Sequence, residues 1–116
     1  MTRFALVLAG ALLALPAAAL AHHGWSSYDT SRVLNIKGKF TSVSWANPHG
    51  SARMVWNGKT WDVILAPVSR MEARGLTRAM IAPGRTVGLV GYPRRDGTRE
   101  MRIERVTVGN KTVELR

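Results

Sequence analysis

The stretch SARMVWNGKTWDVIL, residues 51–65, decides the fold. Apolar side chains recur there at every second position, at Ala52, Met54, Trp56, Trp61, Val63 and Leu65. This spacing is typical of strands that bury one face. Asn57–Gly58 lies between the two runs and is a strong hairpin signal, because both residues readily adopt positive φ. The stretch therefore predicts two antiparallel strands joined by a tight turn.

The segment before the hairpin predicts one long strand with an irregularity. Ile36 and Phe40 follow one phase of the alternation, whereas Val43 and Trp45 follow the other. One extra residue near Thr41–Ser42 restores the phase, which is the effect of a β-bulge. We therefore expect a long bulged strand ahead of the hairpin.

The pattern changes after the hairpin, where a short helix is expected. Ser69 and Glu72 have the spacing of a capping box, in which each side chain accepts a hydrogen bond from a backbone N–H of the first turn. Gly75 predicts the end of this helix. A second short turn is expected over 77–81, ended by Pro83–Gly84.

Strands return in the last third of the chain. Their apolar positions are Val87, Leu89, Met101, Ile103, Val106, Val108, Val113 and Leu115. Residues 95–98 and Gly109–Asn110 have turn-forming sequences. The alternation slips again between Ile103 and Val106, as it does in the first strand.

The predicted order is three strands, a short helix and then two or three strands. We therefore expect an all-β fold with one short helix, a small OB-like Greek-key barrel of order β-β-β-α-β-β. An open sandwich and a β-roll are the alternatives, but a closed barrel would leave fewer exposed edges. The side chains expected to be buried on one face are Val43, Trp61, Val63, Leu65, Val87, Leu89 and Ile103.

Residues 1–21 have the features of a cleavable Sec-type signal peptide. Arg3 supplies a positive charge, an apolar run covers 4–15, and Ala19–Ala21 has the small-x-small pattern of a cleavage site. An uncleaved anchor is the less favoured alternative, because a spanning helix needs about 20 apolar residues. We therefore expect a periplasmic protein.

Cleavage after Ala21 would leave a single OB-like domain over 22–116, with an extended N-terminal arm over 22–32. No second apolar stretch has spanning length, so we expect no membrane span in the mature protein. The chain contains no cysteine, so packing, a metal or a partner must stabilise this small domain.

The chain carries a formal charge of +10 at pH 7, which favours anionic partners. The basic residues are scattered, however, and the cluster at Arg94–Arg99 falls in a predicted turn. Export also argues against nucleic acid as the normal partner. We expect no enzymatic activity, because the chain has no thiol, no nucleophile elbow, no phosphate-binding glycine loop and no evident acid–base pair.

The three histidines are concentrated in two short motifs, His22–His23 and Asn47-Pro48-His49. Cleavage after Ala21 would free the α-amine of His22, which can chelate a metal together with Nδ1 of the same residue. His49 would supply a third nitrogen, and imidazole is a good ligand for Cu(II), which ranks highest among divalent ions. In a second geometry, His23 binds with the free amine and its own backbone amide. The candidate metal ligands are therefore His22, His23 and His49, with copper as the expected ion.

A simpler interpretation gives the histidines no ligand role. A free chain end tolerates many residues, and His49 can cap a turn or pack beside Trp45.

The alternative function is a non-enzymatic binding module for an anionic or protein partner. OB folds often bind extended ligands on exposed aromatic residues. The candidate aromatic residues are Trp45, Trp56, Trp61 and Tyr92. Their spacing equally fits a buried strand face.

Three segments resemble a family of small exported bacterial proteins with no established function. They are AHHGWSSYD at 21–29, G-x-F-x-x-V-x-W-x-N-P-H at 38–49, and the stretch at 65–108 that begins LAPVSRMEARG. The resemblance implies export and a single domain. It also marks His22–His23 and Asn47-Pro48-His49 as recurring features of the family, and it implies no particular activity.

Overall fold

A computed structural model describes residues 24–116 of the protein. The predicted signal peptide and the candidate ligands His22 and His23 lie outside these residues. The elements are η1 (Gly24–Ser27), β1 (Leu34–Ser44), β2 (Ser51–Trp56), β3 (Lys59–Ile64), α2 (Val68–Ala73), η2 (Arg78–Ile81), β4 (Thr86–Pro93), β5 (Glu100–Val108) and β6 (Lys111–Glu114). Here η denotes a short 3-10 helix.

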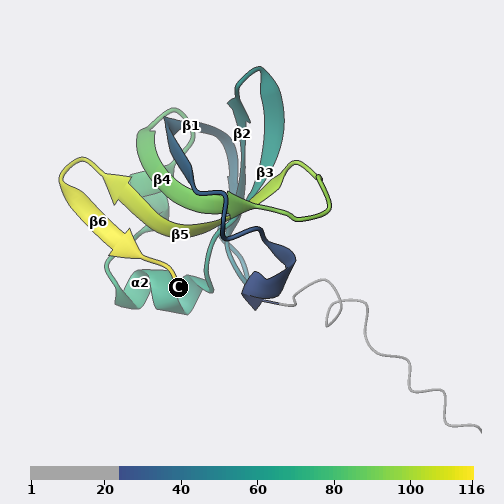
Figure 1. The fold of residues 1–116 in the computed structure, drawn as a ribbon. Coiled ribbons are helices and arrows are strands. Elements are labelled where there is room, and N and C mark those ends of the chain that lie inside the picture. Colours follow the sequence, from purple (N-terminus) through teal and green to yellow (C-terminus); the bar gives the residue numbers. More distant parts are fainter. Residues whose placement is uncertain (1–23) are drawn as a thin grey trace, which may run out of the picture.

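The strands form one sheet in the order β3-β2-β1-β4-β5-β6, with antiparallel neighbours. A parallel pairing of Asp62–Ile64 in β3 with Glu100–Arg102 in β5 closes β1 to β5 into a barrel. Figure 1 shows this barrel, with β6 as an extension beside β5. The predicted small OB-like barrel and its order of elements are confirmed, and β6 is the additional strand.

The irregularities that the sequence predicts are present in the strands. In the β1–β2 pairing, Phe40 lies opposite Met54 and Ser42 lies opposite Arg53, so Thr41 is the extra residue. The β2–β3 turn has positive φ at Asn57 (50°) and Gly58 (72°). Both the predicted bulge and the predicted hairpin turn are confirmed.

The helix differs from its prediction at its start. Its N-cap is Pro67, no side chain caps it, and the helix begins at Val68. The expected capping box of Ser69 and Glu72 is therefore wrong, because Ser69 lies inside the first turn instead of at the N-cap. The expected stop at Gly75 is confirmed, with φ of 88° and a bond from its N–H to the Glu72 carbonyl.

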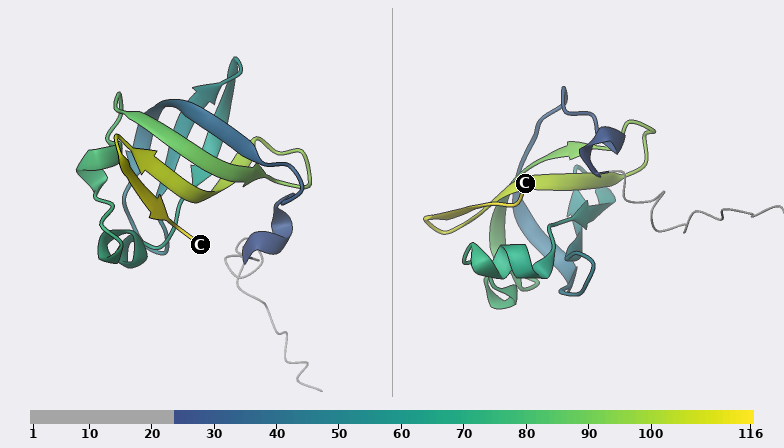
Figure 2. Two further views of the ribbon diagram at one scale, coloured as in Figure 1. Left: turned by 60° about the vertical axis from the view of Figure 1, so that its left-hand side comes forward. Right: turned by 90° about the horizontal axis from the view of Figure 1, so that it is seen from below.

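Helices α2 and η2 lie across one end of the barrel (Figure 2), where they contribute Met71 and Ile81 to the core. Five of the seven expected core residues are buried: Val63, Leu65, Val87, Leu89 and Ile103. Val43 and Trp61 are only half-buried and pack against this core. Trp61 lies on the β2–β3 hairpin, which extends past the barrel (Figure 1), so its ring packs against Trp56 with centroids 5.7 Å apart.

The N-terminal segment packs on the barrel instead of extending away from it. Residues 24–27 form η1, and Tyr28 is buried and pairs with Arg94 at the end of β4. The expected extended arm is therefore wrong for this part. The physical reason is that Trp25 and Tyr28 bury aromatic surface against the end of the β4–β5 pair.

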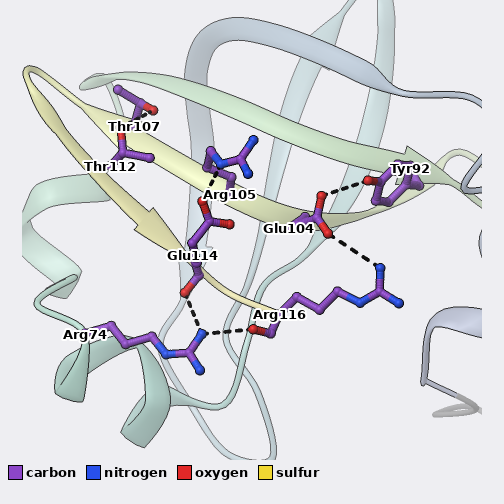
Figure 3. Close-up of polar contacts among 8 residues, drawn as sticks. All are labelled: Arg74, Tyr92, Glu104, Arg105, Thr107, Thr112, Glu114 and Arg116. Atoms are coloured by element: carbon purple, nitrogen blue, oxygen red, sulfur yellow. Dashed lines mark hydrogen bonds and ion pairs between the residues drawn. The ribbon is translucent and has the colours of Figure 1, made fainter.

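Side chains also anchor the C-terminal residues (Figure 3). Arg74, the residue directly after α2, donates hydrogen bonds to the backbone oxygens of Glu114, at 2.8 Å, and Arg116, at 3.0 Å. Glu104 accepts a hydrogen bond from the Tyr92 hydroxyl at 2.8 Å and forms an ion pair with Arg116. These contacts connect α2, β4, β5 and the end of the chain.

Candidate functional site

A cavity of about 310 Å³ lies where the N-terminal segment meets the β1–β2 loop and the start of β5. Its lining residues are Gly24, Tyr28, Pro48, His49, Ile64, Pro67, Arg94, Glu100 and Arg102. The closure of the barrel creates this arrangement, because the parallel β3–β5 pairing places Ile64 beside Arg102. Among residues 24–116, the predicted metal ligand His49 lines this cavity.

His49 is half-buried in the β1–β2 loop, directly after the cis peptide bond between Asn47 and Pro48. Its Nδ1 lies 3.2 Å from the carbonyl oxygen of Gly50. A carbonyl oxygen only accepts, so this contact assigns the hydrogen of a neutral ring to Nδ1. The lone pair then belongs to Nε2, which is the nitrogen that can bind a metal.

Gly24 is the first described residue, and it lines the same cavity as His49. The two residues before it are His22 and His23. The structure therefore brings His49 close to the chain position from which the other two candidate ligands extend. It shows nothing of those two side chains.

Glu100 is the centre of a polar cluster in the cavity. Its Oε2 accepts hydrogen bonds from the Tyr28 hydroxyl at 2.8 Å and from Arg94 Nη1 at 3.1 Å. Burial and the hydrogen bond to Glu100 raise the pKa of Tyr28 above its ordinary value. Arg94 also forms an ion pair with Asp96 in the β4–β5 loop.

Arg102 contacts the aromatic residues of the N-terminal segment. Its guanidinium carbon lies 4.6 Å from the centroid of Trp25 and 6.0 Å from that of Tyr28. Arg116 lies 4.7 Å from the same Trp25 ring. Desolvation lowers the pKa of Arg102, the positive charges of Arg70 and Arg116 act in the same direction, and Tyr28 acts in the opposite direction.

Within residues 24–116, no three His, Cys, Asp or Glu side chains are grouped closely enough to hold a metal ion. The described part of the cavity offers one imidazole, from His49, and one carboxylate, from Glu100. A metal site here would therefore require ligands from His22 or His23.

The aromatic residues of the alternative binding face are largely part of the fold. Trp45, Trp56 and Trp61 are half-buried and pack against the core. Tyr92 is buried, and its hydroxyl donates a hydrogen bond to Glu104. These contacts do not produce an exposed row of stacking surfaces.

Sequence reasoning missed most residues that line the cavity with His49. Tyr28 and Arg102 are separated by 74 positions in the sequence. The sequence indicates for Arg94 only a place in a basic turn and not its hydrogen bond to Glu100. The signal available in the sequence is the pair Trp25 and Tyr28, because two aromatic residues close together in a polar segment indicate that the segment packs on the domain.

The fold and cavity define the class: a small closed β-barrel of the OB type with a cavity that is lined by a histidine. The chain belongs to a family of unknown function, DUF6152, whose model matches residues 10–102. This confirms the predicted relation to an uncharacterised family. A search of curated proteins found no significant match. None of the helices in residues 24–116 is long and apolar enough to cross a membrane.

Proposed function

We propose that this protein is exported to the periplasm and, after cleavage behind Ala21, binds a transition-metal ion without catalysing a reaction. Copper is the preferred ion, and His22, His23 and His49 are the candidate ligands. The observation that carries the proposal is that Gly24 and His49 line one cavity.

The reach of the chain supports this arrangement. Consecutive Cα atoms are about 3.8 Å apart, so the Cα atom of His22 lies within roughly 7.6 Å of that of Gly24. An imidazole extends several ångströms further. The α-amine and Nδ1 of His22 would form a chelate, and Nε2 of His49 would complete a three-nitrogen site suited to Cu(II).

Processing is the first test, because the chelate needs the free amine of His22. N-terminal sequencing and intact mass of the protein recovered from the periplasm should show a chain that begins at His22. A chain that begins elsewhere would refute the amine chelate, whatever metal the protein binds.

Titration of Cu(II) by calorimetry at constant pH then distinguishes the two ligand geometries. One extra Met before His22 moves the amine away from the ring and should abolish the His22 chelate, with the fold intact. In that geometry His49→Ala weakens binding to a smaller degree, since the amine and ring of His22 remain. In the competing geometry, His23→Ala is the damaging change and His49→Ala has no effect.

Binding should also depend on pH in a defined direction. The ligands bind after losing their protons, and reference pKa values are about 7.7 for an α-amine and about 6.5 for imidazole. Affinity should therefore fall steeply below about pH 6, and binding should release protons. If the processed wild-type protein binds Cu(II) no more tightly than a short peptide that begins His-His, the proposal is wrong.

The alternative, an OB-like binding module for an anionic or protein partner, has less support. It would require exposed aromatic surfaces, whereas Trp45, Trp56 and Trp61 pack against the core.

A further inference from the structure

Within residues 24–116, the cavity contains two arginines and one carboxylate, so positive charge is in excess. Glu100 accepts a hydrogen bond from Arg94, and Arg94 is also paired with Asp96. The side chain of Arg102 makes no ion pair or hydrogen bond in this part of the chain. The unmatched charge therefore belongs to Arg102.

A cation–π contact with Trp25 holds Arg102 in place, and the hydrogen-bond donors of its guanidinium have no partner within residues 24–116. The ring of Trp25 contacts the guanidinium with a separation of 4.6 Å. The five N–H donors of a guanidinium lie in its plane and point outward from its edge. A planar anion can therefore approach this edge while the contact with Trp25 persists.

The surroundings make an unpaired charge at this position unfavourable. Arg102 is half-buried, and loss of solvent disfavours its charged form. The positive charges of Arg70 and Arg116 add to this effect, and Tyr28 opposes it without cancelling it. An anion bound beside Arg102 would offset both costs, since a paired and hydrogen-bonded charge is tolerated away from water.

The lining also contains apolar residues. Pro48, Ile64 and Pro67 line the cavity together with Arg102. Its volume of about 310 Å³ is at the lower end of the range for sites that hold small molecules. A ligand with a negatively charged end and a compact apolar body matches this combination of an arginine with apolar residues.

We propose that the cavity binds a small organic carboxylate, which pairs with the guanidinium edge of Arg102 and places its apolar body against Pro48, Ile64 and Pro67. A carboxylate matches the guanidinium fork with two parallel hydrogen bonds. The inference does not depend on the metal site, and it is tested on protein that has been freed of metal.

Benzoate is a suitable probe, and benzamide is its uncharged counterpart of the same shape. Metal is removed on a chelating resin, because a soluble chelator is itself a carboxylate. The ligands are titrated into isotope-labelled protein and followed by NMR. Benzoate should shift the Arg102 Nε–H and the amides that line the cavity in a saturable manner. Benzamide should bind at least about tenfold more weakly, because it lacks the charge-assisted bonds.

Variants assign the binding to Arg102. Arg102→Gln should weaken benzoate binding at least about tenfold, and Arg102→Lys should weaken it as well, because a lysine keeps the charge but loses the fork. Arg85→Gln is the matched control, since it removes the same charge from an exposed position outside the cavity and should leave binding unchanged.

Several outcomes would overturn the proposal. Undiminished benzoate binding by Arg102→Gln would do so, as would equal binding of benzamide and benzoate, or the absence of saturable shifts in the wild type. Inorganic phosphate that binds as tightly as benzoate would show a general anion site and reject the apolar part of the proposal. If the spectrum of Arg102→Gln shows an unfolded chain, Arg102→Lys decides, and undiminished binding by that variant rejects the assignment.

Discussion

Tyr28 shows how a single residue takes a role that its neighbours in the sequence do not indicate. It lies in a polar segment, yet it is buried, and its hydroxyl donates a hydrogen bond to Glu100, 72 positions along the chain. Burial and this bond raise its pKa. The tyrosine therefore stays neutral in the folded protein at a pH where an exposed tyrosine ionises.

This contact predicts a specific loss of stability in alkali. An unfolded tyrosine ionises near its ordinary pKa of 10.0, whereas folded Tyr28 keeps its proton. Above that pH the unfolded state binds fewer protons than the folded state, so the free energy of unfolding falls as pH rises. The contribution is complete below about pH 9, begins to fall near about pH 10 and is lost progressively as the pH rises further toward the raised pKa of folded Tyr28.

Thermal unfolding of wild type and Tyr28→Phe between pH 8 and about pH 11 measures this contribution. The wild type should lose stability more steeply than the variant above about pH 10, and lysine ionisation provides the same background in both. Parallel loss in the two proteins would contradict the role of Tyr28. Tyr92, whose pKa is also raised by its bond to Glu104, should behave similarly when changed to Phe.

At the scale of the elements, the pairing of β4 with β5 contains a second bulge. Val90 lies opposite Arg105 and Gly91 lies opposite Ile103, so Glu104 is the extra residue. The bulge turns Glu104 toward Tyr92 and Arg116 (Figure 3). The irregularity that the apolar alternation indicates in β5 thus places a side chain that connects β4, β5 and the C-terminal residue.

Gly91 should be the least replaceable glycine of this pairing. A Cβ atom there would lie 2.5 Å from the carbonyl oxygen of Arg102 and 2.8 Å from Cδ1 of Ile103. Because a backbone oxygen in a paired strand moves little, Gly91→Ala should lower the free energy of unfolding by about 1–3 kcal/mol.

Gly88→Ala is the matched control on the same strand, since its nearest neighbour would be Thr107 Cβ at 3.4 Å. It should change the free energy of unfolding by less than about 1 kcal/mol. A small gain in stability is favoured, because alanine has fewer accessible conformations than glycine in the unfolded chain. Urea unfolding of both variants gives the comparison. Equal effects would show that the close approach at Gly91 does not limit the strand pairing.

At the scale of the whole molecule, stability depends on the barrel interior. The chain has no cysteine, and its core consists of apolar side chains from the strands, from α2 and η2, and from adjoining residues such as Leu65 and Leu76. The parallel contact between β3 and β5 closes the barrel, and Trp25 contacts both Arg102 and Arg116. The two ends of the described chain are thereby held on the same side of the molecule.

Truncation of a core side chain should therefore destabilise the entire domain. Leu89 is 2% exposed, and Leu89→Ala should lower the free energy of unfolding by about 2–5 kcal/mol. Val55 is 57% exposed, so Val55→Ala is a control that should change it by no more than about 0.5 kcal/mol. Chemical denaturation measures both. An unchanged midpoint for Leu89→Ala would mean that β4 faces the core with its other side.

Local signals in the sequence determined most of the fold. The Asn57–Gly58 turn, the bulge at Thr41 and the slip before Val106 each depend on neighbours in the chain, and each is present in the structure. The capping box is wrong because the helix begins at Val68, with Pro67 as its N-cap, two residues earlier than a Ser69 N-cap implies. The prediction that Trp61 is fully buried is wrong, because alternation indicates which face of the strand a side chain occupies and not its distance from the barrel centre.

Only the tertiary structure decided which residues share the cavity. His49 was identified by its own motif, but its proximity to Gly24, Glu100 and Arg102 follows from closure of the barrel. Alternation and turn signals extend over a few residues, whereas the contacts of Tyr28 with Glu100 and of Trp25 with Arg102 join segments far apart in the chain. Such contacts arise when distant strands pair, and for that reason the lining of the cavity depends on the assembled barrel.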